Sequence, residues 1–316
     1  MRIIGLIINT DFVFMWIRVA TPILFASLGA AICTKAGVVN LGLEGIMLIS
    51  ALAGVLGSAF GGSLWWGVAA GLLASAAVSV LFAYFHLVLK ANNVLCGTAV
   101  NTMAAGLTVF VLQLATGEKG SSSSLKSFSF PNVEIAIVKD IPVIGNIVSG
   151  HNALTYFALL MVAAVWFFLY KTPMGLRMRA VGENPSAASS VGQNVIKIQF
   201  LAIILCGFMT ALGGMYLSMG YLNMFVRDMV AGRGFISLAA CSMGQATPIG
   251  ALLSSMVFAF FDGLSNILQV LKIPSEFVQM LPYLATIAGL TVFSIQKAAV
   301  SKRKMKKAAK AGKGMG

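Results

Sequence analysis

The sequence contains few charged residues. Of its 316 residues, 10% are Asp, Glu, Lys or Arg and 59% are hydrophobic, and the mean hydropathy is +0.92. A soluble domain carries about a quarter charged residues because its surface faces water. The shortage therefore excludes a chain of ordinary soluble domains and indicates a surface that faces lipid.

Cysteine and histidine are also scarce, with four and two residues respectively. The cysteines lie in or beside apolar stretches without paired spacing, which is typical of small core residues rather than disulfides or metal ligands. They are Cys33, Cys96, Cys206 and Cys241. His86 and His151 are far apart, and no H-x-x-x-H or C-x-x-C motif is present. We therefore expect neither a metal site nor a cofactor.

Motifs for catalysis are absent as well. The sequence has no G-x-x-x-x-G-K followed by Ser or Thr, so the chain cannot hydrolyse ATP itself. It also has no G-x-S-x-G, no H-E-x-x-H and no paired His and Asp within its apolar runs. We do not expect an enzyme, and any energy for work must come from a partner ATPase or an ion gradient.

Long apolar runs fill most of the chain, and about 20 such residues cross about 30 Å of hydrocarbon. Nine candidate spans lie at residues 12–33, 41–60, 64–89, 94–115, 153–170, 200–219, 235–245, 249–270 and 277–295. The seventh is too short to cross alone and is expected to be a half-helix that ends before Thr247 and Pro248. The sequence predicts an all-α integral membrane protein, a polytopic bundle of about nine spans over residues 1–296, with a basic tail at 297–316.

Basic residues are distributed unevenly between the two sides of this predicted bundle. The net charge is +13, and residues 297–313 hold eight Lys or Arg and no acid. With this tail inside, the cytoplasmic side holds fourteen basic residues and the outer side six, as the positive-inside rule requires. We expect a multi-pass protein of the cytoplasmic membrane, with the C-terminus cytoplasmic and the loop at 116–152 outside. The bilayer, rather than nucleic acid, accounts for the basic charge.

The cytoplasmic loop at 171–199 contains the signals of a short helix. Asn184 can cap a helix, and Pro185 suits its first position. Gly192 then provides a stop, so a helix of about two turns is expected. From the residues alone, this can be an ordinary interfacial helix or one that docks in a groove on a partner.

Several blocks of sequence resemble permeases of ABC importers in the branched-chain amino-acid, ribose and nucleoside superfamily. Residues 182–192, G-E-N-P-S-A-A-S-S-V-G, are similar to the loop that carries the coupling helix in that family. Residues 37–45, G-V-V-N-L-G-L-E-G, and 232–240, G-R-G-F-I-S-L-A-A, resemble signatures of the nucleoside branch. Residues 248–253 and Asp262 follow in the family's order. The sequence departs from the pattern at 244–247, where the family often has a bulky aromatic residue.

This resemblance implies the transmembrane permease subunit of an importer for nucleosides, guanosine or similar. It implies three partners: an ABC ATPase subunit, a second permease subunit that is homologous or identical, and an extracellular substrate-binding lipoprotein. The ATPase would dock on a coupling loop formed by Gly182, Glu183, Asn184, Pro185, Ala187, Ala188 and Gly192. The alternatives are a permease for simple sugars or branched-chain amino acids, and an ion-coupled carrier, although no repeat between the two halves supports the carrier.

Two carboxylates and three amides within or beside the spans are candidates for the substrate pathway. They are Asn40, Glu44, Asn101, Asp262 and Asn266. A charge at the centre of a bilayer costs at least about 2.5 kcal/mol unless it faces a cavity or a partner. Glu44 can instead cap the backbone of a broken helix, Asp262 can bond a neighbouring helix, and the amides can bond between helices. Since Arg18 and Arg233 are expected near span ends, the pathway suits a neutral rather than a phosphorylated substrate.

Overall fold

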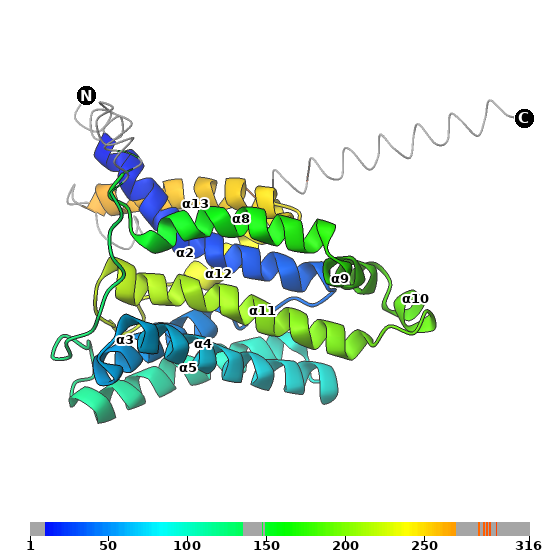
Figure 1. Ribbon diagram of the computed structural model, residues 1–316, viewed down its shortest axis with the longest axis horizontal. Coiled ribbons are helices and arrows are strands. Elements are labelled where there is room, and N and C mark those ends of the chain that lie inside the picture. The colour runs from blue at the N-terminus through cyan, green and yellow to red at the C-terminus, as the bar shows by residue number, and fades with distance from the viewer. Residues whose placement is uncertain are drawn as a thin grey trace, which may run out of the picture.

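The computed structural model describes residues 10–134, 147, 149–269 and five single positions between 284 and 295. Figure 1 shows helices that run side by side, with the connections gathered at two ends. The long helices are α2 (Thr10–Lys35), α3 (Leu43–Gly61), α4 (Leu64–Ala83), α5 (Asn93–Thr116), α8 (Ala153–Lys171), α11 (Val195–Met215) and α13 (Pro248–Gln269). Short π-helical segments, η1 (Tyr84–Val88) and η2 (Tyr216–Tyr221), continue α4 and α11. The shorter helices are α9 (Pro173–Glu183), α10 (Pro185–Ser190) and α12 (Arg233–Met243).

Seven helices in the described part are long and apolar enough to cross a membrane. They match the first six predicted spans and the eighth, with ends that differ by a few residues. The seventh prediction corresponds to α12, which has 11 residues and is short as expected. The ninth, at 277–295, and the basic tail lie almost wholly outside the described residues. The count of nine spans and the division at residue 296 therefore stay predictions.

Polar residues at the ends of the apolar runs determine where helices begin. The side-chain oxygen of Asn92 accepts a hydrogen bond from the Val94 N–H at 2.8 Å, and that of Asn152 accepts one from the Leu154 N–H at 3.1 Å. These bonds satisfy donors that lack a partner within the first turn. Gly117 ends α5 in the left-handed region, at φ +76°.

The helices α2 and α3 form the centre of the bundle. Most of the residues in these two helices are buried, whereas most of those in α4, α5 and α8 are not. α2 packs on α11 and α13, and α3 packs on α4, α5 and α11. A side chain at Gly29 would place its Cβ 2.7 Å from the Cys206 carbonyl oxygen, so α2 and α11 meet through small residues. The outer helices expose apolar side chains that suit lipid or a second membrane protein.

The loops at the two ends of the bundle are far apart (Figure 1). The segment after α5 lies at the end where α2 begins, whereas α9 and α10 lie at the opposite end. Ser122 of that segment is buried, and its hydroxyl accepts a hydrogen bond from the Phe225 N–H at 2.8 Å. The segment is thus attached to the loop that precedes α12, which fits the expected external cap.

We predict that cysteines introduced at Ser124 and Ser189 react from opposite sides of the membrane. Both side chains are exposed, and they lie at opposite ends of the bundle. Ser124→Cys should react with a membrane-impermeant maleimide on intact cells, and Ser189→Cys only after permeabilisation, because basic loops stay inside. The four native cysteines, each at most 9% exposed, give a low background. Reaction of both variants on intact cells would contradict the orientation.

Candidate functional site

The short helix α12 begins among α2, α3 and α13. The chain reaches it through a tight turn in which Asp228, Ala231 and Gly232 have φ of +58°, +49° and +82°. The first N–H groups of a helix have no partner within it, and they lie at the positive end of the helix dipole. A helix that starts inside a membrane bundle therefore needs an acceptor from elsewhere in the protein.

Glu44, in the first turn of α3, supplies that acceptor. One carboxylate oxygen accepts a hydrogen bond from the Gly232 N–H at 2.8 Å, and the other accepts one from the Gly234 N–H at 2.7 Å. Bonds to a carboxylate are stronger than bonds between neutral groups. The geometry is that of a cap, one of the two roles left open for Glu44, and the capped helix is α12.

Steric constraints explain why the residues on either side of Arg233 are glycines. A Cβ built on Gly234 would lie 2.6 Å from the Glu44 backbone nitrogen and 2.7 Å from its carboxylate. At Gly232, the left-handed backbone disfavours any side chain. The G-R-G sequence thus lets two backbone N–H groups approach α3 closely.

The Arg233 side chain pairs with Asp262 of α13. A guanidinium nitrogen lies 3.0 Å from a carboxylate oxygen of Asp262, and both side chains are partly buried. A second nitrogen donates to the Val230 carbonyl at 3.3 Å. Because the two charges neutralise each other at membrane depth, neither is left as a lone ion. Asp262 therefore joins α13 to α12.

Asn40 and Asn101 hold the backbone around Glu44. Asn101 of α5 accepts a hydrogen bond from the Gly45 N–H at 2.9 Å and donates to the Leu41 carbonyl at 3.0 Å. The fully buried Asn40 accepts one from the Gly42 N–H at 3.0 Å. These amides bond backbone groups, as interhelical and local contacts commonly do, and a role in the substrate pathway stays a prediction for both.

Asn266 lies one turn after Asp262 and borders a cavity of about 260 Å³, which we call the inner cavity. Its walls come from α2, η2, the loop before α12, α12 and α13. Arg18, Tyr221 and Arg233 are among the lining residues. Of the polar groups predicted from the sequence, Glu44 and Asp262 thus contact the start of α12, Asn40 and Asn101 bond the backbone beside Glu44, and Asn266 lines a cavity.

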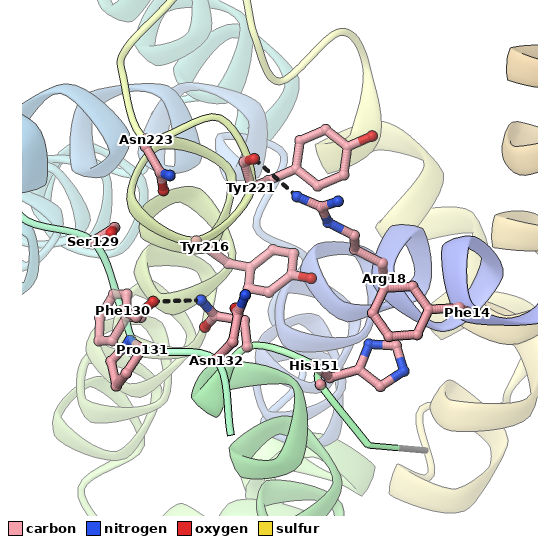
Figure 2. A pocket seen from close by; sticks show the side chains of 13 residues that line it. Phe14, Arg18, Ser129, Phe130, Pro131, Asn132, His151, Tyr216, Tyr221 and Asn223 are labelled. Atoms are coloured by element: carbon pink, nitrogen blue, oxygen red, sulfur yellow. Dashed lines mark hydrogen bonds between the residues drawn. The ribbon is translucent and has the colours of Figure 1, made fainter. Parts of the chain in front are cut away.

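A second cavity of about 290 Å³, the outer cavity, lies at the end of the bundle where α2 begins. Figure 2 shows Arg18, Tyr216 and His151 arranged around the same space. Arg18 donates a hydrogen bond to the Tyr221 carbonyl at 2.9 Å, and its guanidinium carbon lies 4.1 Å from the centroid of the Tyr221 ring. Arg18 and Tyr221 line both cavities, so this pair separates them.

His151 and Phe14 both line the outer cavity, and their side chains pack against each other. Their rings stack with centroids 4.0 Å apart and planes 9° apart. The imidazole Nε2–H donates to the Ile147 carbonyl at 2.9 Å, since a carbonyl can only accept, and this leaves Nδ1 as an acceptor. Burial lowers the pKa of His151, and the positive charge of Arg18 acts in the same direction, against the effect of the Ile147 bond. The ring is therefore neutral at pH 7.

Sequence reasoning assigned no role to Arg18 or His151. Arg18 lies more than two turns into α2. A cation inside an apolar run is itself a signal of function, and it could have identified Arg18. His151 carried no comparable signal, because the residues around it come together only in the folded chain.

At the opposite end of the bundle, α10 has the local structure expected of the coupling loop. The Asn184 side chain accepts a hydrogen bond from the Ala187 N–H at 3.0 Å, Pro185 is the first helical residue, and Gly192 follows with φ +81°. Ala188 is buried and Ala187 is exposed. Docking of a partner on this helix stays a prediction.

Comparison with known proteins identifies the family. The model of a family described as branched-chain amino acid transport system / permease component matches residues 12–290. The chain belongs to this permease family. The permease is 38% identical over 288 residues to the nucleoside ABC transporter permease protein NupC of Lactococcus lactis subsp. cremoris (strain MG1363), covering 87% of this chain and 89% of that protein. It is thus an ABC transporter permease and a multi-pass membrane protein.

Two further relatives extend the comparison. The guanosine ABC transporter permease protein NupQ of Bacillus subtilis (strain 168) is 36% identical to the permease over 286 residues, covering 87% of this chain and 89% of that protein. The putative glucose ABC transporter permease protein TsgC13 of Haloferax volcanii is 35% identical over 251 residues, covering 78% of this chain and 74% of that protein. The recognised blocks at 37–45 and 232–240 are the ones that Glu44 joins in the structure.

We predict that replacing Glu44 by Gln destabilises the permease. The amide nitrogen would face one of the two glycine N–H groups and could not accept its hydrogen bond. A buried donor without an acceptor costs about 1–3 kcal/mol, so thermal unfolding of the purified permease in detergent should begin at a lower temperature. Glu118→Gln, at an exposed acid, is the control and should leave the curve unchanged. An unchanged curve for Glu44→Gln would contradict the capping role.

Proposed function

We propose that this ABC permease carries nucleosides, guanosine or similar, across the cytoplasmic membrane in the inward direction. The observation that carries the substrate assignment is the pair of relatives named for nucleoside and guanosine transport, at 38% and 36% identity over 87% of the chain. The outer cavity agrees with it, because aromatic rings and polar side chains line the same space. Nucleobases stack on aromatic rings, and their edges and ribose hydroxyls bind polar groups.

The charges around the two cavities favour a neutral nucleoside over a nucleotide. Asp262 neutralises Arg233, and Arg18 already bonds the Tyr221 carbonyl and its ring. A phosphate group calls for several charge-assisted donors. The described part of the permease does not gather such a set at either cavity.

A simple sugar is the second candidate substrate. It is favoured by the 35% identity to a relative named as a putative glucose permease. The family description, which names branched-chain amino acids, keeps that class as a third. Two relatives of higher identity are named for nucleoside and guanosine transport, so we place both classes below nucleosides.

The partners of the permease follow from its lack of an ATP-binding motif. In our proposal, two copies of an ABC ATPase dock on the α10 helices of two permease subunits, identical or homologous, and an extracellular lipoprotein delivers the substrate. The basic residues near the C-terminus place that end of the chain in the cytoplasm in this proposal. ATP can drive transport only if the ATP-bound ATPase pair favours one state of the pathway over the other.

Reconstitution tests the substrate assignment. We predict that the permease, assembled with the products of its neighbouring genes in proteoliposomes, takes up labelled guanosine saturably and only with ATP. Ribose and leucine should enter at background rates, and guanosine monophosphate should neither enter nor compete. Saturable ribose or leucine uptake without guanosine uptake would overturn the nucleoside assignment and leave the importer standing.

Replacing Ala187 by Glu tests the coupling loop. The side chain is exposed on α10, so the change should leave the fold intact and place an unpaired charge in a docking groove. Burial of an unpaired charge at an interface costs about 2–5 kcal/mol, which corresponds to a loss of uptake of more than about tenfold. Ala180→Glu, at an exposed alanine of α9, is the matched control. Normal uptake by Ala187→Glu would remove α10 as the contact.

A further inference from the structure

The outer cavity has a size and an aromatic lining that suit a flat ligand. Its volume of about 290 Å³ is close to the lower end of the range for small-molecule pockets, about 300 Å³. Phe14 and His151, whose rings stack on each other, line it together with the rings of Tyr216 and Tyr221. Figure 2 shows these rings around one space. Any nucleobase can stack on such rings, because every base has a π-face.

The polar residues that line the outer cavity differ in exposure between its rim and its interior. Ser129, Asn132 and Asn223 are exposed, whereas His151 and Tyr216 are buried. Hydroxyl and amide groups at the rim can bond ribose hydroxyls, which both donate and accept. A nucleoside would therefore enter with its base inward and its ribose at the rim.

Arg18 gives the interior of the outer cavity a preference for acceptors. Among the described residues, no carboxylate lines this cavity, and the neutral His151 carries no charge. A guanidinium has five N–H donors, and within the described part of the permease Arg18 uses one, on the Tyr221 carbonyl. Guanine presents two acceptors, O6 and N7, that Arg binds with its fork, whereas adenine places a donor amino group on that edge.

We propose that the outer cavity is a binding site for purine nucleosides, and that Arg18 selects bases with an oxygen at C6, guanine and hypoxanthine, over adenine. The proposal rests on the proposed function and adds a location and a specificity to it. Arg18 and Tyr221 also line the inner cavity, so a base held by Arg18 would lie beside the residues that separate the two cavities.

Protection of an introduced thiol tests the site. Ser129→Cys places a reactive group at the rim of the outer cavity, and the four native cysteines are buried. Guanosine and inosine should slow the reaction of Ser129→Cys with N-ethylmaleimide in purified permease at concentrations about tenfold below those of adenosine. Ribose should protect least. Ser124→Cys, exposed at the same end but outside the cavity lining, should react at the same rate with or without ligand.

A second variant tests the role of Arg18. Lysine keeps the positive charge but lacks the planar fork and its stacking on Tyr221. In Ser129→Cys combined with Arg18→Lys, guanosine and adenosine should protect at similar concentrations. An unchanged reaction rate at Ser124→Cys in the Arg18→Lys background, together with an unchanged unfolding temperature, shows that the variant is folded. A guanosine preference that survives in Arg18→Lys overturns the assignment of specificity.

The outcomes separate this site from the transport function. If no nucleoside protects Ser129→Cys while the assembled transporter with Ser129→Cys still takes up guanosine, the site is wrong and the proposed function stands. If ribose protects as well as guanosine, the cavity does not recognise the base. If adenosine protects as well as guanosine in the otherwise unchanged permease, Arg18 does not select the base.

Discussion

The two hydrogen bonds from the start of α12 to the Glu44 carboxylate pair the first N–H groups of a buried helix with a buried carboxylate. Each group would otherwise lack a partner inside the bundle. A helix too short to cross the membrane must start inside protein, and each N–H left unpaired in hydrocarbon costs several kcal/mol. A carboxylate at the same depth needs donors to remain charged. Gly232 and Gly234 bring these donors within 2.8 and 2.7 Å of Glu44 because neither has a side chain in the way. Asn101 then fixes the backbone from which Glu44 projects.

The contact of Glu44 with Gly232 and Gly234 also positions the charged side chain between the two glycines. With the glycine N–H groups turned toward α3, the Arg233 side chain reaches Asp262 on α13, and the pair is neutral beside the inner cavity. Arg18, paired with a ring and a carbonyl rather than an acid in the described part, is left between the two cavities. Cavities lined by one such cation, aromatic rings and amides suit a polar, flat and uncharged molecule. The nucleoside proposal and the predicted exclusion of nucleotides rest on the same distribution of charge.

Local chemistry explains which features the sequence could predict. The seven long helices follow from apolar runs of sufficient length, and α10 follows from Asn184, Pro185 and Gly192, which lie within nine positions of one another. The partner of Glu44 could not be predicted in this way, since 188 positions separate it from Gly232. The outer cavity combines four distant segments, and Arg18 gains its role only because α2 passes beside η2. The blocks that identified the family are therefore also the ones whose contacts required the fold.

The central helix α2 gives the proposed coupling a physical route through the permease. Its last residue, Lys35, leads to Gly37, where a Cβ would lie 3.1 Å from the Cα of Gly182 at the end of α9, directly before α10. The side chain of Gln199 in α11 also contacts this turn, because it donates a hydrogen bond to the Ala36 carbonyl at 3.2 Å. Two small residues in contact leave no flexible side chain to absorb a displacement, so a shift of α9 and α10 acts on the end of α2. Arg18 belongs to the same helix, about 25 Å from Lys35 at 1.5 Å per residue. Pro22, which cannot donate the helical hydrogen bond to the Arg18 carbonyl, lies between the two. A displacement of the end of α2 by α10 would therefore reach Arg18 through a helix that can bend at Pro22.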